Sequence, residues 1–200
     1  MTIAADFRAK NMDQWNCRNT VRIFLALVLA VLSAPAFANS GNAVQNRMDR
    51  DARQGRPLVA HVLVALADNT CQGIVPVPKE LGNGQDPGRN LYWGALYGVK
   101  TYFKRQGKWQ IVKHSGGTHE GVLRRTVFTT TIERKGIGGV PVFVVAEAWD
   151  GCNIKDTIKR FIELARGREP DRIVISHEGR SQPIAAGGQA HVIVYVGHNG

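Results

Sequence analysis

The chain has few cysteines and few acidic residues, and it lacks the short motifs of the common enzyme classes. Only three cysteines occur in 200 residues and no two form a CxxC pair, which excludes a zinc ribbon and a disulfide-dense miniprotein. No P-loop, GxGxxG, HExxH or GxSxG is present, so nothing marks a nucleotide site, a zinc protease or a serine hydrolase. We therefore expect no cofactor.

The charge balance is basic. Lys and Arg number 26 against 16 Asp and Glu, a formal net charge of +10, while 44% hydrophobic and 21% charged residues are ordinary for a globular chain. The basic residues look scattered along the chain rather than massed, which argues against a nucleic-acid partner. Anionic envelope surfaces or acidic ligands suit this charge better.

The N-terminus has the pattern of a secretory signal. Arg18 and Arg22 precede an apolar run at 23–32, and residues 33–38 (SAPAFA) end on a small-x-small pattern. The run is shorter than the roughly 20 apolar residues of a membrane span, so an uncleaved anchor is the less favoured alternative. We expect cleavage after Ala38, export to the periplasm or the medium, and no stable membrane span in the mature chain.

Cleavage would remove Cys17 and leave Cys71 and Cys152 in an oxidising compartment, where two remaining thiols favour a disulfide. Two separate thiols are the alternative. Residues 39–56 are polar and lack apolar periodicity, so we expect a flexible lead-in followed by a single domain at 57–200.

Three valine-rich apolar runs, at 58–67, 141–149 and 191–196, are typical of buried strands. Apolar spacing predicts helices at 91–104 and 153–166. Shorter strands are expected at 109–113, 122–132 and 172–176. This alternation predicts an α/β three-layer sandwich with a mainly parallel central sheet and an inserted β-hairpin at 109–132. The last strand leaves an uncovered edge, which indicates a domain truncated at its C-terminus or one completed by a partner strand.

Polar residues end each apolar strand, and ligands of open α/β sheets bind at the carboxyl ends of the strands. This edge is the predicted site for a small-molecule or peptide ligand. The loop at 82–90 precedes a predicted helix N-terminus and adds two candidates. The predicted binding residues are Asp68, Asn69, Asn83, Asp86, Asp150 and Asn199.

His198 is the candidate general base, because it directly follows an apolar strand and histidine side chains can serve as general bases near neutral pH. His61 and His191 lie in or at the start of apolar strands, and we interpret them as structural. His114 and His119 flank a Ser-Gly-Gly-Thr turn but lack a third ligand, so no metal site is predicted.

The Gly-His-Asn-Gly ending and the helix-separated strands resemble the caspase-like cysteine peptidase fold over roughly residues 58–200. The resemblance implies that the histidine after one core strand, here His198, works with a cysteine after the next strand. This chain has no cysteine at that place, which leaves Cys152 as a weak alternative nucleophile. The segment GNGQDPGRNLYWGALYGVKTYF also resembles a bacterial group of unassigned function.

Two functions remain open on this evidence. The first is an exported hydrolase-type domain that lacks the usual nucleophile in this chain, and for it we claim no activity. The second is a non-enzymatic envelope module that binds a small or anionic ligand.

Overall fold

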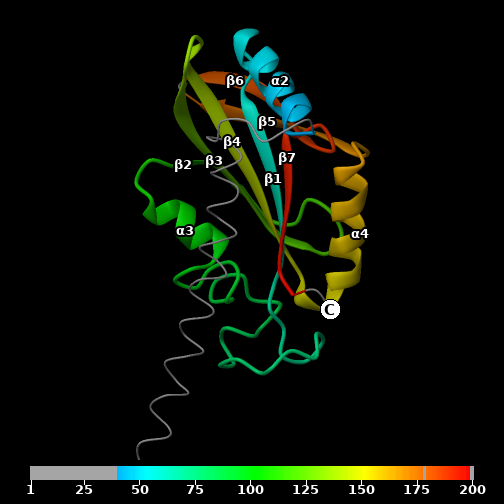
Figure 1. Ribbon diagram of the computed structural model, residues 1–200. Helices are drawn as coiled ribbons and strands as arrows, with labels where there is room; N and C mark the ends of the chain where they lie inside the picture. The colour runs from blue at the N-terminus through cyan, green and yellow to red at the C-terminus, as the bar shows by residue number, and fades with distance from the viewer. Residues whose placement is uncertain (1–39, 178, 199–200) are drawn as a thin grey trace, which may run out of the picture. The chain divides into compact units, whose positions relative to one another are not determined.

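The computed structural model of the protein describes residues 40–177 and 179–198 (Figure 1). The signal predicted at 1–38 lies outside the described residues, and so do Cys17 and Asn199. In the described part of the chain, no helix is both long enough and apolar enough to span a bilayer.

A five-stranded sheet in the order β2-β3-β4-β1-β7 forms the centre of the domain. Strands β4, β1 and β7 are parallel neighbours, whereas β3 runs antiparallel to both β2 and β4. The α/β class is confirmed, but the sheet is mixed rather than mainly parallel, because short turns join β2, β3 and β4 as hairpins. The strands are β1 (Leu58–Ala65), β2 (Gln110–Ser115), β3 (Val122–Arg134), β4 (Gly138–Trp149) and β7 (Val192–Val196).

The two central strands are covered on both faces. All eight residues of β1 are buried, and so is β4 from Val142 to Trp149. This burial explains their continuous apolar sequences. Strand β7 is only half-buried at all five positions, because it is the edge strand and pairs only with β1 among the described residues. The strand itself was predicted, but its burial on both faces was not correct. A partner strand along the side of β7 that faces away from β1 stays a prediction.

One face of the sheet packs against a β-hairpin and a helix, as Figure 1 shows. The hairpin consists of β5 (Pro170–His177) and β6 (Arg180–Gly187), and the helix is α4 (Ile154–Ala165), preceded by the short η1 (Gly151–Asn153). Ile173, Ile175 and Ile184 of the hairpin join the core with Val59, Val127, Phe143 and Val145 of the sheet. Strand β5 and helix α4 were predicted, but β6 was missed, since Pro and Ala weaken its strand signal.

The opposite face carries the short helix α3 (Val99–Arg105). Phe103 stacks on Phe128 of β3 with ring centroids 5.0 Å apart. The helix predicted at 91–104 thus begins eight residues late. A Cβ on Gly94 would lie 2.0 Å from the carbonyl oxygen of Gly88, so this glycine allows the chain to fold back on its own loop rather than continue as a helix.

The segment expected to be a flexible lead-in forms the helix α2 (Ser40–Arg53), so that prediction was wrong. Met48 and Ala52, four residues apart, are buried. The Arg134 Nε donates to Asp49 at 2.7 Å and ties the helix to the end of β3. Only four of its fourteen residues are apolar and only two of these are buried, which gives little periodicity, and the contacts that stabilise the helix are made with distant residues.

Candidate functional site

The predicted site lies at the carboxyl ends of β4, β1 and β7, which are parallel neighbours and end at one edge of the sheet. Asp150 follows β4, Asp68 lies just after β1, and His198 follows β7, so the structure does place these residues at one edge. That edge is covered by residues 66–98, which join β1 to α3 without a helix or strand (Figure 1).

Asp68 is engaged by the protein's own backbone. Its Oδ1 accepts hydrogen bonds from the N–H groups of Thr70 at 2.8 Å and Cys71 at 2.7 Å, and its Oδ2 accepts from Gly84 at 3.0 Å. Burial raises the pKa of this carboxyl, but the three backbone donors outweigh it and leave the pKa below its ordinary value. Asp68 therefore stabilises a turn as a carboxylate.

The other predicted binding residues have similar local partners. Asn69 exchanges two hydrogen bonds with the backbone of Val77, and Asp150 accepts from Gln85 Nε2 at 2.7 Å and from the Cys152 N–H at 2.8 Å. Asn83 and Asp86 each accept from a backbone N–H two residues further on. These side chains fix the covering segment.

Two buried amides that sequence reasoning missed hold the same segment in place. Asn90 Oδ1 accepts from the Ala67 N–H at 3.0 Å, and its Nδ2 donates to the Ala67 carbonyl at 2.8 Å. Gln72 Nε2 donates to the carbonyls of Leu66 at 2.7 Å and Gly151 at 2.8 Å. The only hint of this role in the sequence is that each is an amide side chain within a segment rich in turn residues.

Cys71 and Cys152 form a disulfide, the first of the two alternatives that the sequence left open. The bond connects the covering segment to η1, immediately after β4. Because the Cys152 sulfur is bonded to Cys71, it is not a thiol, and the weak alternative of Cys152 as a nucleophile is wrong for the disulfide-bonded protein. At His198, the backbone carbonyl accepts from the Tyr195 hydroxyl at 2.5 Å.

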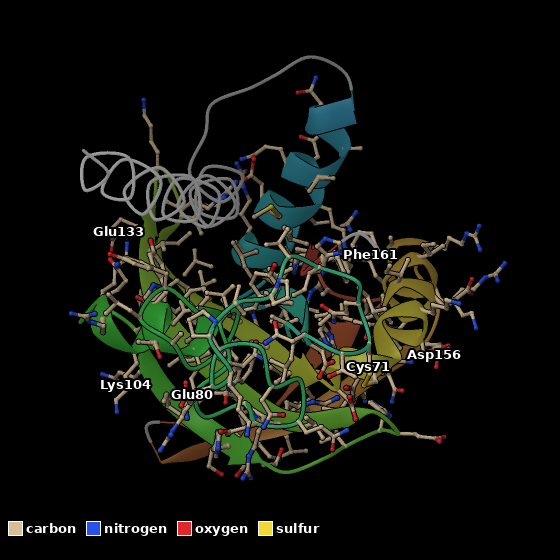
Figure 2. All side chains as sticks on the ribbon, turned by 90° about the horizontal axis from the view of Figure 1, so that it is seen from below. Cys71, Glu80, Lys104, Glu133, Asp156 and Phe161 are labelled. Atoms are coloured by element: carbon tan, nitrogen blue, oxygen red, sulfur yellow. A yellow bond between two sulfur atoms is a disulfide. The ribbon has the colours of Figure 1, made fainter. Side chains whose placement is uncertain are left out.

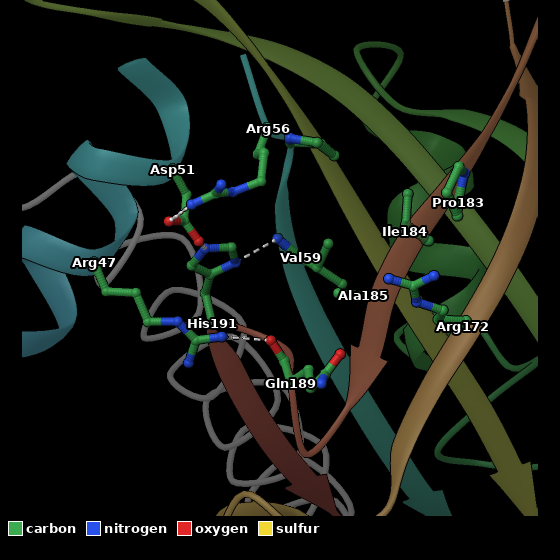
Figure 3. Close-up of a pocket in the computed structure, with 11 residues that line it drawn as sticks. Arg47, Asp51, Arg56, Val59, Arg172, Pro183, Ile184, Ala185, Gln189 and His191 are labelled. Carbon is green, nitrogen blue, oxygen red and sulfur yellow. Dashed lines mark hydrogen bonds and ion pairs between the residues drawn. The ribbon is translucent and has the colours of Figure 1, made fainter. Parts of the chain in front are cut away.

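A cavity lies toward the opposite end of β1, between α2, the start of β1 and the β5–β6 hairpin (Figure 3). Its volume is about 360 Å³, within the range of small-molecule sites. We call it the arginine cavity. Its polar lining is Arg47, Asp51, Arg56, Arg172, Gln189 and His191, and its apolar lining is Pro57, Val59, Pro183, Ile184 and Ala185.

The three arginines of the cavity differ in their partners. Arg47 donates to the backbone carbonyl of Gln189 at 2.5 Å, a neutral acceptor, and Arg56 donates to Asp51 at 2.5 Å. Arg172 is exposed, and its guanidinium has no hydrogen bond or ion pair with any described residue. The arginines thus bring three positive charges to the cavity wall and Asp51 one negative charge.

His191 connects α2 to β1 beside this cavity. Its Nδ1 accepts from the Val59 N–H at 3.1 Å, so its Nε2 carries the proton and donates to Asp51 at 3.1 Å. Burial and the Arg47 charge lower the pKa of His191 more than its contacts with Asp51 raise it. The imidazole therefore stays neutral near pH 7, and the structural interpretation of His191 agrees with these contacts.

A buried charge cluster lies on the hairpin-facing side of the sheet. The Arg125 guanidinium donates to Glu147 at 2.5 Å and to Asp171 at 2.7 Å, and lies 3.2 Å from His119 Nε2. Donor atoms of His119, Glu147 and Asp171 lie within 4.8 Å of one another, close enough to hold a metal. Arg125 contacts all three and already supplies the cation among them.

Comparison with protein-family models finds no family that matches this chain, and comparison with curated proteins finds no matching relative.

Proposed function

We propose that this protein is an exported, non-enzymatic binding domain that holds a small anionic ligand in the arginine cavity. The observation that carries the proposal is Arg172, an arginine at the cavity wall without a partner among the described residues. An anion would pair with Arg172 on the hairpin, and Arg47 on α2 lines the cavity from the other side (Figure 3).

The chemistry of the wall supports a carboxylate or phosphate group. A guanidinium presents its N–H donors as a planar fork that matches two oxygens of either anion. Arg56 forms an ion pair with Asp51, whereas Arg47 and Arg172 form none with any acidic residue among those that the structure describes. The Pro, Val, Ile and Ala side chains of the lining suit an apolar portion of the ligand.

Export is the second part of the proposal. It is supported by the signal pattern at 1–38 and by the disulfide, since structural disulfides persist in oxidising compartments. A periplasmic or secreted domain would meet its ligand outside the cytosol.

The hydrolase-type alternative, with a caspase-like topology, depends on His198 as its base. It needs a nucleophile within hydrogen-bond reach of that imidazole. The disulfide engages both Cys71 and Cys152, so in this state neither thiol can serve. We therefore favour the binding function.

Calorimetric titration at low ionic strength tests the proposal, with phosphate, acetate and hexanoate as probes. We expect saturable binding of at least one probe, weakened about 10-fold or more in Arg172→Gln, because a hydrogen bond to a charged group contributes roughly 1.5–3 kcal/mol. The matched control is Arg89→Gln, an exposed arginine outside the cavity. Absence of saturable binding for all three probes, or an equal loss in both variants, would contradict the proposal.

A further inference from the structure

One stretch of the chain is strongly basic. Between Asp86 and Glu120 there is no acidic residue, whereas six residues are Lys or Arg. The basic residues are therefore massed here, which the expectation of scattered charge overlooked. Three of the six lie on α3 and one on β2, and the other two, Arg89 and Lys108, lie outside these elements.

The fold brings part of this stretch to one side of the sheet. His114 of β2 pairs with Thr126 of β3 and bonds its hydroxyl at 2.8 Å, on the face that α3 covers. Burial lowers the pKa of His114, and the nearby charges of Lys100 on α3 and Arg124 on β3 lower it further. Lys100 and Arg124 thus approach the same imidazole from two different elements.

The basic side chains around this histidine are not paired with acidic side chains in the described part of the chain. None of them makes an ion pair with another residue in the part of the chain that the structure describes. Figure 2 shows Lys104 at the periphery of the molecule, on the side opposite Asp156 of α4. We define the α3–β2 basic face by Lys100, Lys104, Arg105, Lys108 and Arg124.

Two exposed aliphatic side chains accompany these charges. Leu96, in the turn before α3, is 52% exposed, and Ile111 of β2 is 43% exposed. Ile111 pairs directly with Phe128, so its side chain lies on the same face of the sheet as α3. Aliphatic groups contribute nothing to phosphate-backbone contacts in nucleic acid, but they insert into the interfacial region of a bilayer.

We propose that the α3–β2 basic face docks the domain on an anionic lipid surface, with the cations on the headgroups and Leu96 and Ile111 in the interface. Juxtaposed lysines and arginines attract anionic lipids in this way, and the attraction falls as salt rises. The docking is peripheral and uses no membrane-spanning helix. It is independent of the arginine cavity, which lies at the α2 end of the sheet.

Co-sedimentation with vesicles tests the docking. The protein is mixed with vesicles of phosphatidylcholine containing phosphatidylglycerol, or of phosphatidylcholine alone. We expect binding to the anionic vesicles only, reduced roughly 25-fold in the double variant Lys104→Gln, Lys108→Gln, since each basic residue near the surface contributes about fivefold. The matched control, Lys155→Gln with Lys159→Gln, removes the same charge from exposed positions of α4 and should bind as the unaltered chain does.

Two further measurements make the result decisive. Leu96→Ser should weaken vesicle binding several-fold and leave binding to a DNA oligonucleotide unchanged. Tighter binding to the oligonucleotide than to the vesicles at equal phosphate would overturn the proposal in favour of a nucleic-acid partner. The proposal would also be overturned if Leu96→Ser bound vesicles as tightly as the unaltered chain, or if the α4 control lost as much vesicle binding as the Lys104, Lys108 double variant. Absence of vesicle binding at low salt would overturn it as well.

Discussion

At the scale of single residues, Glu147 is the charged group on which the core depends most. Its carboxylate is fully buried, accepts from Arg125 of β3 and from Trp149 Nε1 at 3.1 Å, and lies 3.4 Å from His61 Nε2 of β1. Arg125 also donates to Asp171 of β5. One carboxylate therefore contacts two neighbouring strands and, through Arg125, the hairpin.

We predict that Glu147→Gln destabilises the protein by about 3–5 kcal/mol. The substitution replaces the carboxylate by a neutral amide, so the nearly buried Arg125 keeps only Asp171 as an anionic partner, and breaking a buried ion pair costs about that much. Urea unfolding followed by circular dichroism gives the change. Glu163→Gln, at the surface of α4, is the control and should have a much smaller effect. Equal losses in both variants would contradict the role assigned to the cluster.

The same carboxylate predicts a pH dependence. Burial alone would raise the pKa of Glu147, but His61 and Arg125 hold it at about 2, below the ordinary 4.5. A lowered carboxyl pKa stabilises the folded state above pH 4.5, and that stabilisation is lost as the pH falls toward 2. The loss is on the order of 3 kcal/mol. Between pH 6 and pH 2, the unfolding free energy of Glu147→Gln should fall less steeply than that of the unaltered protein. An equal fall in both proteins would contradict the lowered pKa assigned to Glu147.

At the scale of elements, residues 66–98 show how a long irregular segment becomes fixed. Asp68, Asn69 and Asn90 satisfy its backbone groups, and the disulfide ties it to η1. The segment covers the sheet edge at which ligands of open α/β sheets usually bind. Its polar residues resemble binding residues in sequence because turn formation and ligand binding use the same side chains.

We predict that replacing both bridging cysteines by serine costs about 3–4 kcal/mol. The disulfide joins residues 81 positions apart and restricts the unfolded chain over that length. Urea unfolding of the double variant measures the loss, and the unaltered protein under reducing conditions should unfold at nearly the same midpoint. Thiol titration of the unfolded, non-reduced protein should detect no free thiol in the chain cleaved after Ala38, and Cys17 alone in the uncleaved chain. Additional reactive thiols would show that the bridge does not form.

At the scale of the whole molecule, the basic residues of the two proposed binding regions lie on different elements and would bind different anions. The arginine cavity gathers residues from α2, the start of β1 and the hairpin, whereas the cations of the α3–β2 basic face lie on α3, in the turn between α3 and β2, and on β3. The net charge of +10 alone indicates only a general attraction for anions. Which anion binds where depends on the way the fold distributes that charge.

Much of the fold was predictable because its signals are local. The continuous apolar sequences of β1 and β4 and the periodic stripe of α4 are properties of short stretches, so those elements were predicted close to their observed bounds. Helix α2 and strand β6 were missed, since contacts with distant residues stabilise them. Gly94 shows the same limit. A glycine is needed there because the Gly88 carbonyl lies close to its Cα, a contact that the residues next to Gly94 in the sequence do not reveal.

The sequence by itself determined the α/β class and the central strands, because local periodicity suffices for these, and it left a disulfide between Cys71 and Cys152 open beside two separate thiols. Tertiary structure alone decided that residues 66–98 cover the carboxyl ends of the parallel strands, where the site was predicted. It also decided that β7 is the outermost strand on its side of the sheet. It also brought Arg47, Arg56 and Arg172 to one cavity. Residues so far apart in the chain approach one another only through packing, which no local pattern records.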